Sequence, residues 1–472
     1  MLPRLNERPQ LHLHLPLPLH EEPIRTTERK HLQPAPIPAI VSQHVEESAH
    51  LRTVRAVLVR APHVRLLQLA RIDERIAAHL DGIAVAGDAG VAMIQRALER
   101  PGVGEIFVAA VRALEDRDAT RLDKLLSITE ALRPSRAGLL SAFGWVSGSQ
   151  LQGTTMMLLA AVEPWRREVG LAACALHGVN PGSALDQALR DADASLRARA
   201  LRAAGQCGRR DLMDACLDAC LDAMSGDEKY CAFEAARAAL LLGDRHASVA
   251  ALEAIALDPA AAAACPRALR TVLKVVAPAR AKVLLASLAA LAETAPMGMR
   301  TLMQAVATAG DPHYLPWLIA QMHERAFARV ASEAFTMITG VDLAQADLEL
   351  KPPNDVELGP GNNPAQADIA MDDDESLPWP DVVKIRNWWQ ANGAQFTVGS
   401  RYFMGEPPNP SKCLDVLKNS SQRQRIEAAE YLTLLAPGTP LFNTHAPAWR
   451  QQRALAKLTP APTHFLHDRS HS

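Results

Sequence analysis

Residues 196–224 read LRARALRAAGQCGRRDLMDACLDACLDAM, and this stretch decides the fold class. On either side of Gly208 its apolar residues recur at the three- to four-residue spacing of a buried helix face. Gly208 stands where the first helix ends, because glycine readily adopts the left-handed conformation found at helix ends. Asp191 or Asp193 can cap the start of that helix. The stretch therefore predicts two short helices joined by a tight turn.

The same unit recurs along the chain. Residues that follow an apolar helical run are spaced by 30, 30, 35, 34 and 33 positions, and they are Gly148, Gly178, Gly208, Gly243, Ala277 and Gly310. A helix pair of this size cannot bury its apolar face alone, so it stacks on its neighbours. We therefore expect an all-α fold: seven helix pairs in a HEAT-type α-solenoid, one further helix, and a small C-terminal helical module.

Changes in composition divide the chain into six regions. In chain order they are a disordered leader rich in Pro and His (1–40), an N-terminal helical region (41–100), the repeat array (101–340), an acidic linker (341–380), the C-terminal helical module (381–458) and a flexible tail (459–472). Between residues 351 and 380 there are seven acidic side chains and one basic side chain. This predicts a solvated linker, with docking on a basic partner through Trp379 as the alternative.

The charge balance gives little support to nucleic-acid or membrane binding. The 472 residues include 50 Lys and Arg against 52 Asp and Glu, a net charge of −2. The best candidate for a membrane span, AKVLLASLAALA at 281–292, is too short to cross a bilayer. We expect a cytoplasmic protein with no nucleic-acid partner and no inserted segment.

The seven cysteines fall mostly within apolar helical stretches. They are expected to be reduced and buried, because free cysteine behaves as a small hydrophobic residue. Cys216 and Cys220 are one helical turn apart and share a face, which leaves a metal pair open as an alternative. No second Cys pair or nearby His completes a tetrahedral set of ligands, so we expect no metal.

The motifs of common catalytic sites are missing from the sequence: there is no GxSxG, HExxH, GxGxxG or P-loop. We therefore expect a protein that is not an enzyme and carries no cofactor. In a solenoid the concave face usually binds the partner, and we expect the second helix of each pair to line it. Candidate protein-binding residues chosen on this basis are Arg209, Arg210, Asp214, Arg245, His246, His313 and Trp317, with Trp379 of the linker.

Several passages resemble a family of uncharacterised bacterial HEAT-repeat proteins associated with type VI secretion gene clusters. The most distinctive are FTMITGVDLAQADLE (335–349), MDDDESLPWPD (371–381) and APAWRQQRAL (446–455); VRAPHVRLLQLARIDERIAAHLDGI (59–83) and LRARALRAAGQCGRRDL (196–212) also match. The resemblance spans about Val41 to Leu458 and implies an accessory role in a contractile secretion apparatus. It brings no reaction and no catalytic residue. A weaker similarity, to the repeat family that includes phycobilin lyases, rests on the repeats alone.

These observations favour a scaffold or adaptor that binds a protein, such as a component or effector of the secretion apparatus. The alternative is an enzyme of the lyase or hydrolase class, with a pocket between the repeat array and the C-terminal module. A third hypothesis, nucleic-acid binding, requires one continuous basic stripe formed by Arg197, Arg199, Arg202, Arg209 and Arg210.

Overall fold

The computed structural model describes residues 35–226, 228–261, 264–292, 298–353 and 374–458. Within these ranges the chain is predominantly helical, which confirms the all-α prediction. The leader up to residue 34, residues 354–373 of the linker and the tail from 459 lie outside the described residues. The end of the predicted leader belongs to a helix, since α1 begins at Pro38.

The α-helices follow one another with short connections. They are α1 (Pro38–Leu58), α2 (Leu66–Val85), α3 (Asp88–Ala97), α4 (Val103–Glu115), α5 (Ala119–Ala131), α6 (Arg136–Trp145), α7 (Thr154–Leu159), α8 (Pro164–His177), α9 (Ser183–Ala188), α10 (Ala194–Cys207), α11 (Met213–Ser225), α12 (Lys229–Leu242), α13 (Ala247–Ala256), α14 (Cys265–Leu273), α15 (Pro278–Ala292), α16 (Gly298–Ala309), α17 (Leu315–Gln321), α18 (Ala328–Thr339), α19 (Val382–Asn392), α20 (Pro410–Asn419), α21 (Gln422–Leu435) and α22 (Ala448–Leu458).

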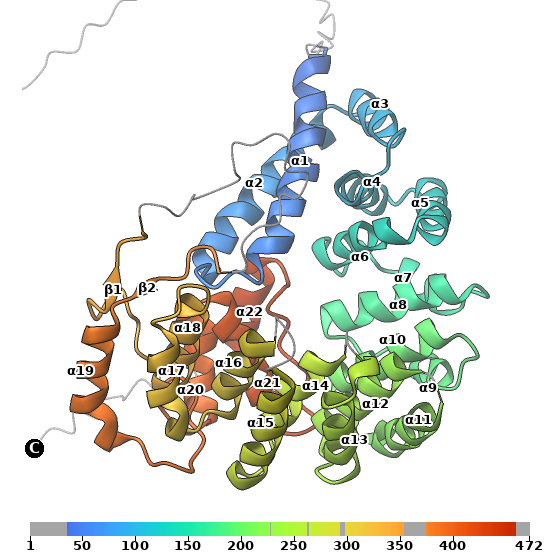
Figure 1. Cartoon of the computed structure of the whole chain (residues 1–472). Helices are drawn as coiled ribbons and strands as arrows, with labels where there is room; N and C mark the ends of the chain where they lie inside the picture. Colours follow the sequence, from blue (N-terminus) through green and yellow to red (C-terminus); the bar gives the residue numbers. More distant parts are fainter. Residues whose placement is uncertain (1–34, 227, 262–263, 293–297, 354–373, 459–472) are drawn as a thin grey trace, which may run out of the picture.

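The middle of the chain is built from pairs of these helices. We call α4, α6, α8, α10, α12, α14, α16 and α18 the first helices, and α5, α7, α9, α11, α13, α15 and α17 the second helices. Each first helix contacts the first helix before and after it. Together they form an arc around the C-terminal helices α20, α21 and α22, drawn in red in Figure 1.

The quoted stretch folds as predicted. Asp193, and not Asp191, caps α10: its carboxylate accepts a hydrogen bond of 2.9 Å from the backbone N–H of Leu196. At the other end Gly208 has a φ of +69°, which favours glycine. The apolar side chains of α10 and the thiols of Cys216 and Cys220 on α11 belong to the largest hydrophobic core, and burial raises the pKa of both thiols.

The ends of the first helices are of two kinds. Gly178, Gly208, Gly243 and Gly310 each follow a first helix directly and have a positive φ, as the spacing predicts. Two first helices end before their landmark residue: α6 ends at Trp145, before Gly148, and α14 ends at Leu273, before Ala277. At these two positions arginines of a distant segment bind the carbonyl groups that the helix leaves unpaired.

That distant segment is residues 401–458, which we call the C-terminal segment. Arg450 donates to the carbonyl oxygens of Gly144 and Val146, at 2.7 and 2.9 Å, at the end of α6. Arg401 donates to the carbonyl oxygen of Lys274 at 2.7 Å, just after α14. An arginine therefore provides at α6 and α14 the capping that a glycine turn provides elsewhere.

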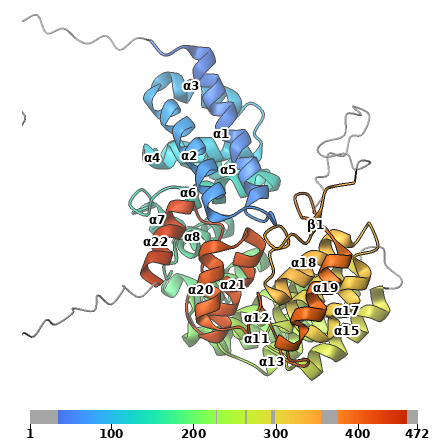
Figure 2. The same cartoon turned by 90° about the vertical axis from the view of Figure 1, so that its left-hand side faces the viewer.

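The C-terminal segment also reaches the other first helices from α8 to α18. The contacts to backbone carbonyl oxygens are Asn443 Nδ2 to Leu176 (3.3 Å), Leu441 N to Gln206 (2.9 Å), Gly438 N to Leu241 (3.3 Å), Tyr402 N to Gly310 (2.9 Å) and Met404 N to Met337 (2.7 Å). Gln422 donates to the carbonyl oxygens of Val59 and Val64 in the connection between α1 and α2, and the N–H of Ala448 donates to the carboxylate of Asp73 on α2. The C-terminal segment thus connects the N-terminal helices α1 and α2 to most of the first helices of the arc (Figure 2).

The described ends of the acidic linker are also in contact with the array. Strand β1 (Glu349–Leu350) pairs antiparallel with β2 (Trp379–Pro380), placing Leu350 opposite Trp379. Asp374 is 3% exposed and forms an ion pair with Arg300 of α16. The prediction of a solvated acidic run is therefore wrong for Asp374, because the partly buried Arg300 pairs with it.

No single helix in the described part of the chain has both the length and the apolar character needed to cross a membrane. The bent pair α2 and α3, at 117° to each other, meets that test only when the two helices are taken together.

Candidate functional site

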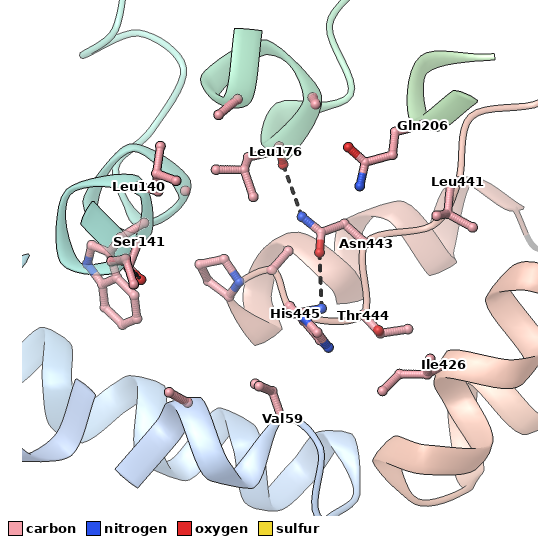
Figure 3. Close-up of a pocket in the computed structure, with 18 of the residues that line it drawn as sticks. Val59, Leu140, Ser141, Leu176, Gln206, Ile426, Leu441, Asn443, Thr444 and His445 are labelled. Carbon is pink, nitrogen blue, oxygen red and sulfur yellow. Dashed lines mark hydrogen bonds between the residues drawn. The ribbon is translucent and has the colours of Figure 1, made fainter. Parts of the chain in front are cut away.

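A cavity of about 580 Å³ lies between the first helices and the C-terminal segment. Figure 3 shows Val59, which follows α1, Leu140 and Ser141 of α6, and Leu176 of α8 around the same space as His445 of the C-terminal segment. Its size is in the range of small-molecule sites in proteins. The cavity is therefore the candidate functional site.

The walls of the cavity come from helices that were not expected to form the inner face. Phe107 of α4, Leu140 of α6, Leu176 of α8, Gln206 of α10 and Arg237 of α12 all belong to first helices. The prediction that second helices line this face is wrong for the cavity. The first helices face the C-terminal segment because their ends bind it.

One wall is apolar and partly aromatic. Phe107 and Trp145 pack edge to face, with ring centroids 5.8 Å apart, and Trp449 of α22 packs edge to face on Trp145. Trp145 is 8% exposed, so the ring is held in place by the core. Aromatic rings fixed in this way offer a flat, rigid contact surface for an apolar group.

The polar part of the lining is strongly basic. It contains six arginines and one carboxylate, that of Glu430; the arginines are Arg52, Arg55, Arg60, Arg199, Arg202 and Arg237. Three of them form close ion pairs, Arg55 with Asp73, Arg202 with Glu234, and Arg237 with Glu430 at 2.9 Å. The contact of Arg199 with Glu168 is long: 3.5 Å separate the nitrogen and oxygen atoms, which is at the limit of a hydrogen bond.

The carboxylate of Glu430 is held ionised. Burial alone would raise its pKa, but Lys274 and Arg237 outweigh the burial and lower the pKa to about 2. Lys274 is itself buried and also forms an ion pair of 2.7 Å with Glu427. A carboxylate with so low a pKa is a poor proton acceptor near neutral pH.

The imidazole of His445 is neutral at pH 7. His445 is an exposed residue that lines the cavity, with protein atoms of several elements around it. Desolvation by these atoms, followed by the positive charges of Arg60, Arg55 and Arg425, lowers its pKa to about 4. Its backbone N–H is fixed by the side chain of Asn443 at 3.1 Å.

None of the eight residues chosen from the sequence lines this cavity. Arg209 forms ion pairs with Asp186 at 2.9 Å and Asp211 at 2.6 Å, so its charge is balanced locally. Arg210 lies beside Gly438, and Arg245 donates to the carbonyl oxygen of Leu434 at 2.9 Å. Both of these arginines therefore contact the C-terminal segment.

The other predicted residues are dispersed over the surface. Asp214 on α11, His246 at the start of α13 and His313 before α17 are exposed. Trp317 is half-buried against the core. Trp379 lines a smaller groove beside Pro380 and Val382 and lies under the guanidinium of Arg329, 4.9 Å from the ring centroid.

The five arginines proposed as a basic stripe do not share one surface. Arg199 and Arg202 line the cavity, but Arg197 pairs with Glu228 and Arg209 pairs with two aspartates. Arg199 and Arg202 are three residues apart on an otherwise Ala- and Leu-rich helix. These two arginines are therefore a feature of the sequence from which part of the cavity wall could have been predicted. Residues 441–447 also line the cavity, but nothing in their sequence indicates it.

We compared the chain with family models, curated proteins and solved structures, and none matches it. Its function is therefore inferred from the cavity and the surfaces described above.

Proposed function

We propose that this protein is a HEAT-type helical-repeat adaptor that binds another protein, in the cytoplasm, as an accessory of type VI secretion. The observation that carries the adaptor proposal is the stacking of first helices, joined along the arc by the C-terminal segment. Such an arc has a large surface, which suits the binding of another protein better than catalysis.

The HEAT-type arrangement is supported by the regularity of the helix ends. Gly178 and Gly208 end successive first helices with nearly the same φ, +67° and +69°. Equivalent backbone turns at equivalent positions are expected if each pair repeats the geometry of the one before it.

The link to secretion is supported by the resemblance of three distinctive passages. In the structure these passages connect elements that are distant in the sequence. Leu350, next to the first passage, pairs with Trp379 of the second. Arg450 of the third passage donates a hydrogen bond to the end of α6. A related protein that contains these passages is expected to form the same contacts between the linker strands and between the C-terminal segment and α6.

The enzyme hypothesis requires a pocket at the junction of the array and the C-terminal segment, and the cavity lies there. Its acid–base groups favour binding instead. Glu430 is committed to ion pairs with Arg237 and Lys274, and the other ionisable side chains of the lining are arginines and His445. Arginine stays protonated near neutral pH and does not transfer protons.

The protein partner needs a surface that the C-terminal segment leaves open. Among the residues chosen from the sequence, Asp214, His246 and His313 are exposed and lie on second helices or at their starts. We propose that this outer side of the arc, between α11 and α17, contacts the partner. The inner ends of the first helices are already bound by the chain itself.

We expect sheath, baseplate or effector proteins of a type VI apparatus to co-purify with the tagged full chain from its native host, as identified by mass spectrometry. The triple variant Asp214→Lys, His246→Glu, His313→Glu should lose them by at least about tenfold, because it reverses the charge at Asp214 and adds a negative charge at each histidine, which opposes a complementary partner. Asp123→Lys on α5, exposed and outside this surface, is the matched control. A folded bait that retains no apparatus protein would overturn the proposal, as would equal retention by the triple variant.

A further inference from the structure

The cavity holds two arginines that no carboxylate of the described residues balances. Arg52 donates to the carbonyl oxygen of Ala137 at 2.9 Å and to the hydroxyl of Ser141 at 2.6 Å, both uncharged. Arg60 forms no ion pair within the described ranges, although it lines the same space. Arg52 and Arg60 therefore add about two positive charges to the cavity lining, that of Arg60 on an exposed residue.

A third arginine is incompletely satisfied. The Nε of Arg199 is buried and has no hydrogen-bond partner among the described residues, and its contact with Glu168 is long. Burial, followed by the charge of Arg202, lowers the pKa of Arg199. The long contact with Glu168 leaves the guanidinium of Arg199 weakly paired, and because Arg199 lines the cavity, an anion bound there can be its further partner.

The apolar wall restricts what this ligand can be. A bare inorganic ion would be bound by the arginines but would leave the partly exposed apolar side chains of the lining, such as Leu140 and Leu441, uncovered. A molecule with an anionic end and an apolar body would use both parts of the lining. Guanidinium groups match phosphate oxygens in paired hydrogen bonds, and a phosphate monoester carries nearly two negative charges at neutral pH.

We propose that the cavity is a binding site for a small phosphate monoester with an apolar body, whose phosphate contacts Arg52 and Arg199. The charge of the ester balances the excess of the two unpaired arginines. The proposal goes beyond the adaptor function and does not depend on it, since a bound ester and a protein partner use different surfaces.

Titration calorimetry of the purified full chain with phenyl phosphate tests the proposal. We expect saturable binding that weakens as NaCl is raised. Inorganic phosphate, phenol and benzoate should bind at least about tenfold more weakly, since each lacks the apolar body or part of the charge. Phenyl phosphate should also raise the pKa of His445, followed by NMR, because it adds negative charge among the arginines.

Arg52→Gln and Arg199→Gln are each expected to weaken binding by about 10- to 100-fold, the range for a hydrogen bond to a charged group. The matched control is Arg197→Gln, on the same helix as Arg199 but paired with Glu228 outside the cavity lining. Circular dichroism confirms that each variant is folded. Absence of saturable binding of phenyl phosphate, equal binding of inorganic phosphate, or an equal loss in Arg197→Gln would overturn the proposal.

Discussion

Gly208→Ala is expected to lower the free energy of unfolding by about 2–5 kcal/mol, measured by urea denaturation. Two effects add. The φ of +69° costs a side chain about 1–2 kcal/mol. In addition, a Cβ on Gly208 would lie 2.2 Å from the carbonyl oxygen of Gly438, which is backbone and has to shift. Overpacking of this kind costs about 1–3 kcal/mol.

Gly178→Ala separates the two effects. Gly178 ends α8 as Gly208 ends α10, with a φ of +67°, but a Cβ there would meet nothing within 4 Å. This variant should lose only the backbone part, about 1–2 kcal/mol. The C-terminal segment of Gly208→Ala should also be cleaved faster in limited proteolysis. Equal losses in the two variants would show that the segment does not bind at the end of α10.

The helix pairs are predictable from the sequence because their signals are local. Apolar spacing and a glycine after each run locate α8, α10, α12 and α16, and each helix buries its apolar face on adjacent pairs. The turn at Gly208 is visible in the sequence for the same reason. Its second role, close contact with Gly438, depends on residues 230 positions away and leaves no local trace.

The cavity could be predicted only in part. Arg199 and Arg202 stand out on an apolar helix, but whether they face solvent or a cavity depends on the path of the C-terminal segment. That path is set by long-range hydrogen bonds such as those of Arg450 and Arg401. An arginine that caps a distant helix looks, in the sequence, like any surface arginine. The same reason explains why Asp374 was expected to be solvated.

Lys274→Met is expected to lower the free energy of unfolding by about 3–5 kcal/mol at pH 7. Lys274 is buried after α14 and forms ion pairs with Glu427 and Glu430 of α21. Its removal leaves two carboxylates in the interior with Arg237 as the remaining cation beside Glu430. Breaking a buried ion pair by removing one partner has costs of this size. Arg280→Met, which disrupts an exposed pair with Glu253, is the control and should have no measurable effect.

The pH dependence identifies the cause of the loss. In the wild type the pKa of Glu430 is lowered to about 2, so its contribution is present above the ordinary value of about 4.3 and is lost as the pH falls toward 2. Burial lowers the pKa of Lys274, but Glu427 and Glu430 raise it further, so the contribution of the lysine is lost only as the pH rises through that raised value. The contribution of this ion-pair cluster to the stability of the wild type should therefore be level between about pH 5 and pH 9.

In Lys274→Met less stability is lost at low pH. Without the ammonium only Arg237 still offsets the burial of Glu430, so the pKa of Glu430 rises from its low value and the folded state loses less stability as the pH falls. The difference in stability between wild type and variant should therefore shrink from pH 6 to pH 3. A constant difference would mean that the loss comes from packing and not from charge. Lys274→Met with Glu430→Gln should recover part of the loss, since fewer charges remain buried without a partner. Because Glu430 and Arg237 also line the cavity, the same network fixes the cavity wall and holds α21 against the arc.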